Sequence, residues 1–478
     1  MDDIRNRGVR TPAGRGSGFF AQDWQKLAFF LMLLWCLLPL VMCVDYVVSG
    51  MLGRYSTLEE LRQQGLSLGY VNYDEALGDY QKFFFALGGI TLCFDLICLI
   101  LSRRRVFSLA SVRKKPWFYL FGLFLLWAFV CAELSDYRRY ALYGSDYLRD
   151  GLTSYLVYGA VFLCASMIQN IALRRRILQV FAAVISFLAL VMLIQENVEN
   201  DFINYCFSSR RAVVFNQFNH FGYMLCMAAV TALGLFLFDR GAKRGLKCLY
   251  LADFFYLVYA LVVNDTFGAL LAVVVALPVV FIFYARTGGK LNLRALAIVL
   301  ALAILLGVCF FALTPIGKSV LENFTHLIRD VGKILTNAED AGNAGTDRFG
   351  LWQQTVEKIS KRPIFGYGPE GLIRRHALSE GRMPHNAYLQ IAAYTGIPGF
   401  VLYLLAIVSL AVHHLKRLKM LDAMVLTASG AAFAYMASAF VGVPVFNTEP
   451  YFWLFLGLVT VGTEWEKPLI CPEANRQP

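Results

Sequence analysis

Charged residues are scarce in this chain. Only 16% of its 478 residues are Asp, Glu, Lys or Arg, whereas 58% are hydrophobic. A soluble globular protein of this length does not need so much apolar surface, so the composition argues against that class. A helix needs about 20 apolar residues to cross a hydrocarbon core of about 30 Å, and many runs of that length occur. The sequence therefore predicts an all-α fold, a polytopic transmembrane helical bundle.

Several other features are missing. The 11 cysteines show no metal-site spacing, and most lie inside apolar runs, which argues against a disulfide framework. Low-complexity linkers and clear internal repeats are also absent. Residues 1–26 are polar and basic, and the apolar run after them has no small-residue cleavage site. We therefore expect this run to be a retained anchor rather than a signal peptide.

We predict about twelve spans from the apolar runs. They cover residues 27–49, 83–101, 117–134, 153–172, 177–195, 218–238, 248–263, 267–284, 295–313, 388–412, 422–441 and 451–465. Only Asn264, Asp265 and Thr266 separate the seventh span from the eighth, so these two would form one hairpin.

Lys and Arg indicate the orientation, because they gather in cytoplasmic segments of membrane proteins. The pattern fits a chain with both termini inside, with 1–26 and 466–478 as cytoplasmic tails. Spans one to nine then occupy 27–313, and spans ten to twelve occupy 388–465. The net charge of +11 reflects this topology rather than nucleic-acid binding.

Residues 314–387 form the longest predicted outer segment. Apolar residues at helical spacing over 320–335 predict an amphipathic helix. A second helix is expected to begin near Thr346 or Asp347 and to end at Pro363. Its predicted apolar stripe consists of Phe349, Trp352, Val356 and Ile359. Gly366, Gly368 and Gly371 then allow tight turns.

His385 and Asn386 stand directly before the tenth span. The start of a helix carries free N–H groups and partial positive charge, which disfavour an imidazolium ion. A neutral imidazole there can take a proton from a hydroxyl group. Basic residues that could bind phosphate oxygens are Arg348, Lys361, Arg362, Arg374, Arg375 and Arg382. The pattern favours a base beside a polyanion, although His385 could equally cap the helix and the arginines could touch lipid headgroups.

The same region resembles a known family signature. It contains Arg348 and Trp352, then Pro363-Ile-Phe-Gly366-Tyr-Gly368, His385-Asn386-Ala-Tyr-Leu389 and Gly396-Ile-Pro-Gly399. These residues resemble the signature of the O-antigen ligase and O-antigen polymerase family of bacterial polytopic membrane glycosyltransferases. Asn216 and Asn219, at the start of the sixth span, resemble the family's Asn-x-x-Asn.

The resemblance implies a fold of the membrane glycosyltransferase type that acts at the outer face of the cytoplasmic membrane. The implied donor is an undecaprenyl-diphosphate-linked glycan, the acceptor is a hydroxyl group of a glycan, lipid or cell-wall component, and no metal or cofactor is needed. His385 is implied as the base and Arg348 as a diphosphate contact, supported by Asn386, Asn216, Asn219, Gly366 and Gly368. Many members carry an Arg at the start of the eighth span, where this chain has Thr266-Phe267-Gly268. Arg210 or Arg211 could replace it.

Three alternatives remain open. The first is a polysaccharide polymerase of the same family rather than a ligase. A lipid-linked glycan flippase or transporter would need ionisable residues within spans, and the candidates are sparse: Asp45, Asp95, Asp253 and Glu133. A metal-dependent transferase would use carboxylates of the predicted loop 50–82, which has no Asp-x-Asp pair: Glu59, Glu60, Asp74, Glu75 and Asp79.

Overall fold

The computed structural model describes residues 17–52, 71–101, 114–146, 148–198, 211–215, 217–288, 329, 348–443 and 445–460. Eight helices in these ranges are long and apolar enough to cross a membrane: α1 (Ser17–Met51), α3 (Val71–Leu101), α6 (Pro116–Glu133), α9 (Ile171–Asn197), α11 (Phe218–Phe238), α12 (Arg244–Asn264), α13 (Phe267–Arg286) and α17 (Ala387–Lys416). Three shorter apolar helices are α8 (Leu152–Ser166), α18 (Ala423–Ala439) and α19 (Glu449–Val459). Two more helices are α7 (Arg138–Tyr143) and α16 (Arg348–Lys361).

The all-α polytopic fold is thus confirmed, since every long element of the described chain is a helix and none is a strand. Eleven of these helices coincide with predicted spans, and the α12–α13 hairpin turns at Asn264 to Thr266 as expected. The predicted ninth span, 295–313, and the predicted helix at 320–335 lie outside the described residues. The expectation of a loop over 50–82 is wrong at its end, because α3 already begins at Val71.

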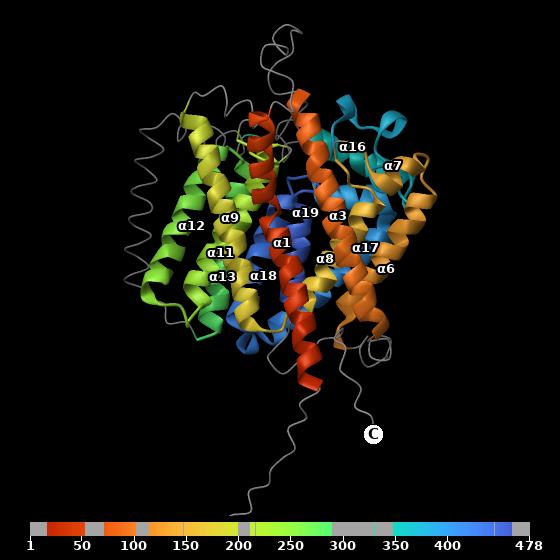
Figure 1. Cartoon of the computed structure of the whole chain (residues 1–478). Helices are drawn as coiled ribbons and strands as arrows, with labels where there is room; N and C mark the ends of the chain where they lie inside the picture. The colour runs from red at the N-terminus through yellow and green to blue at the C-terminus, as the bar shows by residue number, and fades with distance from the viewer. Residues whose placement is uncertain are drawn as a thin grey trace, which may run out of the picture.

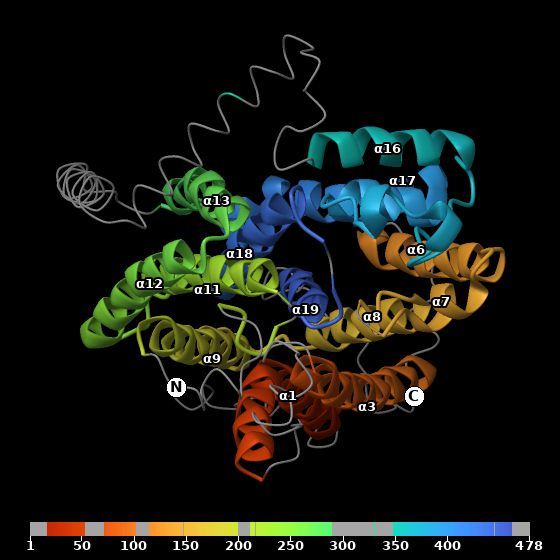
Figure 2. The same cartoon turned by 90° about the horizontal axis from the view of Figure 1, so that it is seen from above.

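The core is built around α11, which is buried along almost its whole length (Figure 2). It packs against α18, α12, α13 and α9. Small residues allow this close approach. Thr427 of α18 sits against Gly234, and Thr266 sits against Gly222, each where a larger side chain would collide.

A second group of helices joins this core from the other side: α17 packs on α6, and α19 packs on α8. A buried ion pair joins α9 to α18 within the first group, at the end opposite α16. The Arg174 guanidinium at the start of α9 lies 2.6 Å from the Asp422 carboxylate, and both side chains are buried. Asp422 also caps α18 by accepting the backbone N–H groups of Met424 and Val425. Such a pair needs these extra hydrogen bonds, because burying two charges is expensive.

Candidate functional site

The predicted signature residues gather at one end of the bundle, where α16 and α7 lie beside the start of α17 (Figure 1). A break in α17 organises this end. Gly396 has φ 66° and ψ 179°, which is not helical, and Pro398 follows it. The break frees the carbonyl groups of Ala393 and Tyr394, and a helix in a membrane needs other partners for such groups.

The glycine-rich motif 363–368 supplies these partners. The backbone N–H groups of Tyr367 and Gly368 donate to the Ala393 and Tyr394 carbonyls, each at 2.9 Å. The Ile397 N–H donates in return to the Pro363 carbonyl at 2.7 Å. Two motifs that are 30 residues apart in the chain therefore form one backbone unit.

Glycine is required on both sides of this contact. Gly366 has φ 61°, and a β-carbon there would collide with the Ala393 carbonyl oxygen. At Gly396 a β-carbon would collide with the Ile364 carbonyl oxygen. Gly368, with φ 82°, lies against Ser135, where a β-carbon would approach the Ser135 Cβ to 2.7 Å. These glycines shape the site through its backbone.

A Ser-Asp-Tyr sequence after α6 binds the segment that follows the motif. The Ser135 hydroxyl donates to the Tyr367 carbonyl at 2.6 Å. The Asp136 carboxylate lies 2.7 Å from Arg362, 2.9 Å from Arg375 and 2.7 Å from His376. His376 and the two arginines hold the pKa of Asp136 well below its usual value. Asp136 therefore holds this loop through Arg362, Arg375 and His376.

Two further loop cations are also occupied. The Arg374 guanidinium lies over the Tyr137 and Tyr140 rings, 5.7 and 5.5 Å from their centroids. Lys361 forms an exposed ion pair with Glu357 at 2.7 Å. Arg374 and Lys361 were both predicted to be able to bind phosphate. Each already has a partner within the protein, which makes a phosphate contact at either residue less favourable.

Glu370 ties the same loop to the segment before α8. Its Oε2 atom accepts the backbone N–H groups of Ser145 and Asp150, both at 2.9 Å. The side chain is fully buried, and its backbone has φ 51°. A non-glycine residue rarely adopts that conformation, so the surrounding contacts must hold it there.

His385 lies just outside α17, and Asn386 is the residue that caps the helix. The Asn386 Oδ1 atom accepts the N–H groups of Tyr388 at 3.1 Å and Leu389 at 3.0 Å. The alternative in which His385 caps the helix is thus wrong. His385 instead has φ 49°, an uncommon backbone conformation that turns the chain into the helix.

The surroundings of His385 keep its imidazole neutral. Burial, and next the charges of Arg348 and Arg382, lower its pKa to about 4. The sequence predicted a neutral imidazole from the helix terminus, whereas desolvation is the main cause. His220, on the first turn of α11, lies near enough to His385 to interact with it electrostatically.

Arg348 opens α16 and differs from the other cations. Burial lowers the pKa of its guanidinium, and the nearest favourable influence is the Tyr223 hydroxyl rather than a carboxylate. Among the residues that the structure describes, Arg348 forms no ion pair. The side chain is half-buried. A partly desolvated guanidinium that lacks a counter-ion in the described chain would be stabilised by an anion beside it.

The rest of α16 packs only partly along its predicted apolar stripe. Leu351 and Thr355 face α17 and are buried, whereas Val356 of the predicted stripe is 54% exposed. Trp352 contacts the Phe440 ring at the end of α18, 5.7 Å away, and Phe440 in turn contacts Tyr388 of α17 at 6.3 Å. Trp352 and Ile359 of the predicted stripe therefore pack against neighbouring elements, and Leu351 and Thr355 extend the buried face.

Arg211 lies beside the start of α13, where the family's Arg is missing. Its Nε atom is 3.1 Å from Glu196, and its NH1 atom is 3.5 Å from Asp265, the residue before Thr266. The position suits a replacement, but two carboxylates already compensate the charge. Asn219 is half-buried on the first turn of α11, while Arg210 and Asn216 lie outside the described residues.

Sequence reasoning missed several residues of this site, namely Asp136, His220, Glu370, Asp150 and Tyr223. The repeated Ser-Asp-Tyr of 135–137 and 145–147 was a visible signal, and the first copy proves to hold the signature loop. Nothing in the sequence marked the buried carboxylates of Asp150 and Glu370 as site residues, because their partners come from distant segments of the chain. Within the described ranges, no group of three or more His, Cys, Asp or Glu residues is placed to hold a metal ion.

Comparison with known families agrees with this geometry. The family model described as O-antigen ligase matches residues 253–404. The match includes α16, the glycine motif, His385 and the break in α17, while Arg211, Asp136 and Asp150 lie outside it. No curated protein matches the chain.

Proposed function

We propose that this chain, which belongs to the O-antigen ligase and polymerase family through residues 253–404, is a glycosyltransferase acting at the outer face of the cytoplasmic membrane. Its donor would be an undecaprenyl-diphosphate-linked glycan, and its acceptor a hydroxyl group of a glycan, lipid or cell-wall component. The single observation that carries the proposal is a neutral His385 beside Arg348, a partly buried cation with no carboxylate partner in the described chain.

The chemistry needs a base and a site for negative charge. His385 takes the proton of the acceptor hydroxyl, whose oxygen attacks the anomeric carbon of the donor. A new C–O bond forms while the bond from that carbon to the diphosphate oxygen breaks. Undecaprenyl diphosphate leaves with the electron pair, and Arg348 stabilises the charge that develops there.

Electrostatics supports the division of roles. Arg348 lowers the pKa of His385, so the same cation that binds the diphosphate keeps the base unprotonated before the donor arrives. When a diphosphate neutralises Arg348, the imidazole becomes a stronger base at the moment when it is needed. Arg362 and Arg375 are held by Asp136, Lys361 by Glu357 and Arg374 by tyrosine rings, which favours Arg348 over these four as the diphosphate contact.

The test is single-turnover transfer by full-length protein with lipid-linked donor purified from the native membranes. His385→Ala should lower the rate by about 10²–10⁴-fold. His385→Asn, whose side chain tolerates the positive φ, should be equally inactive. His413→Asn, at the other end of α17, is the matched control and should retain activity. An active His385→Asn protein would remove the base from the mechanism.

Ligase and polymerase use the same donor, so the acceptor must be identified by experiment. The glycan profile of a deletion strain distinguishes them, because loss of a polymerase leaves single repeat units whereas loss of a ligase leaves unattached polymer. Transfer that survives a chelator would support metal independence, and transfer abolished by it would favour the carboxylate alternative.

A further inference from the structure

We infer that a cavity beside the first turn of α17 binds a neutral sugar ring of one of the two glycans. This inference rests on the proposed glycosyltransferase function. The cavity lies among α6, α8, α17, α18 and α19, and the space free of protein atoms in and in front of it, open solvent included, is about 540 Å³. Ala387 and Tyr388, directly after His385 and Asn386, form part of its wall.

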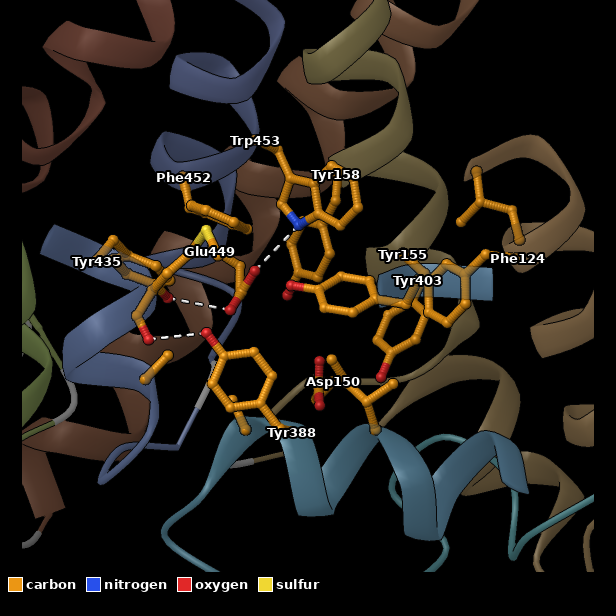
Figure 3. Close-up of a pocket in the computed structure, with 15 residues that line it drawn as sticks. Phe124, Asp150, Tyr155, Tyr158, Tyr388, Tyr403, Tyr435, Glu449, Phe452 and Trp453 are labelled. Atoms are coloured by element: carbon orange, nitrogen blue, oxygen red, sulfur yellow. Dashed lines mark hydrogen bonds between the residues drawn. The ribbon is translucent and has the colours of Figure 1, made fainter. Parts of the chain in front are cut away.

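The walls are mostly aromatic. Tyr155 and Tyr158 of α8, Tyr403 of α17 and Trp453 of α19 surround the space, and Figure 3 shows their rings around a common centre. Aromatic faces pack well against the C–H face of a pyranose. A cavity with apolar walls and a few polar groups is also the usual form of a small-ligand site.

Some of the polar groups that line the cavity have hydrogen-bond partners in the described chain, and others have none. Glu449 accepts hydrogen bonds from the Tyr435 hydroxyl and the Trp453 Nε1–H, both at 3.0 Å (Figure 3). Asp150 is only 1% exposed, and its Oδ2 atom accepts from Gln390 at 3.1 Å. Within the described chain, the Asp150 Oδ1 atom and the Tyr158 hydroxyl, both buried, have no partner.

These two unpaired groups select a hydroxyl-bearing ligand. Burial, together with the charges of Glu370 and Glu449, raises the pKa of Asp150 well above its ordinary value. A neutral carboxyl and a phenol each both donate and accept, as sugar hydroxyls do. An ammonium ion only donates and would require an ionised carboxylate, so a neutral polyol fits better than a cation.

The cavity is also connected to the proposed reaction centre. Tyr435 lines the cavity, and its ring lies 6.2 Å from the ring of Tyr223, the residue that interacts with Arg348. Tyr388 connects the cavity to α16 through Phe440 and Trp352. A sugar held there would lie next to the place where the glycosidic bond forms.

The test uses neutral methyl glycosides of glucose, galactose, mannose and N-acetylglucosamine as probes. Their binding to full-length protein in detergent is measured by saturation-transfer NMR. At least one should bind both the wild type and His385→Ala. Tyr158→Phe keeps the ring and removes a hydroxyl that has no protein partner, so the fold should persist while binding weakens by about tenfold.

Two further variants complete the design. Tyr250→Phe removes the α12 hydroxyl that accepts a hydrogen bond from Gln179, far from the cavity, and should bind like wild type. Ala439→Leu narrows the cavity from the end of α18 and should abolish binding. In native membranes, relief of glycoside inhibition by added acceptor assigns the cavity to the acceptor, and relief by added lipid-linked donor assigns it to the donor.

The outcomes separate this inference from the proposed function. If no glycoside binds, or if Tyr158→Phe binds as tightly as wild type, the inference is wrong even when His385→Ala is inactive. If tetramethylammonium binds in place of the glycosides, the cavity is a cation site instead. If glycosides bind as expected but His385→Ala transfers normally, the sugar site stands and the proposed mechanism fails.

Discussion

The pH dependence of glycan transfer gives the sharpest test of His385. The pKa of this imidazole is lowered from 6.5 to about 4, chiefly by burial and then by Arg348 and Arg382. A base works only in its neutral form, so transfer should stay constant down to about pH 5 and fall as the pH drops through 4. At pH 5, about 90% of an imidazole with this pKa is neutral, against about 3% of an unperturbed histidine.

The assay is kcat/KM for transfer by purified full-length protein between pH 4 and pH 8. This ratio reports the free enzyme, whereas kcat reports the enzyme–substrate complex. Because bound diphosphate would neutralise Arg348, the acid limb of kcat should lie at higher pH than that of kcat/KM. Enzyme held at pH 4.5 and assayed again at pH 7 shows whether any loss is reversible.

One substitution checks the electrostatic cause. Arg348→Gln removes a positive charge that lowers the pKa of His385, so the remaining activity should show its acid limb at higher pH. Lys361→Gln is the matched control on the same helix, because Lys361 is exposed and paired with Glu357. A wild-type acid limb between pH 6 and pH 7, or a limb that Arg348→Gln leaves in place, would refute this reasoning.

The remaining predictions concern the diphosphate contact, the helix break and the topology. Arg348→Lys should lower single-turnover transfer by on the order of 10²-fold because the bidentate fork is lost, and a rate like wild type would make Arg348 structural. Gly396→Ala should lower the thermal unfolding temperature, because its backbone conformation alone costs a non-glycine residue roughly 1–3 kcal/mol of stability. Gly89→Ala, whose new β-carbon meets nothing within 4 Å, should not lower it. Equal stabilities would contradict the proposed clash. Asn343→Cys should react with an impermeant thiol reagent from outside and Lys243→Cys only from inside, and labelling of both from one side would overturn the topology.

The helices were predictable because their cause is local. Long apolar runs, and the polar residues between them, correctly predicted eleven of the described helices. They also predicted the tight turn at Asn264 to Thr266. The start of α3 was predicted too late, because its first residues include Asn72, Asp74 and Glu75 and so precede the apolar run that marks the span. The exposed Val356 shows a second limit of the prediction. The spacing of apolar residues predicts that α16 has an apolar face, but it does not predict which edge of that face contacts α17.

The position of His385 was also predictable, but the cause of its neutral state was not. The sequence places the residue at a helix entry, whereas its burial depends on segments far along the chain, with Arg348 and Arg382 contributing charge. The role of Asn386 follows a local capping rule, and that rule alone would have separated the cap from the base. The local sequence therefore determines where the helix begins, whereas tertiary packing determines the protonation state of His385.

The same distinction explains why basic residues in the loop look equivalent in the sequence but not in space. Arg362, Arg375 and Arg348 offer the same guanidinium, and only their partners differentiate them. Asp136, from the end of α6, neutralises two of them, while burial leaves Arg348 without a carboxylate in the described chain. A cation that is already paired gains little from an added anion, whereas a desolvated one gains much. The arginine that we propose as the diphosphate contact thus differs from the others in having no acid beside it in the described chain, and this difference depends on the fold rather than on the motif.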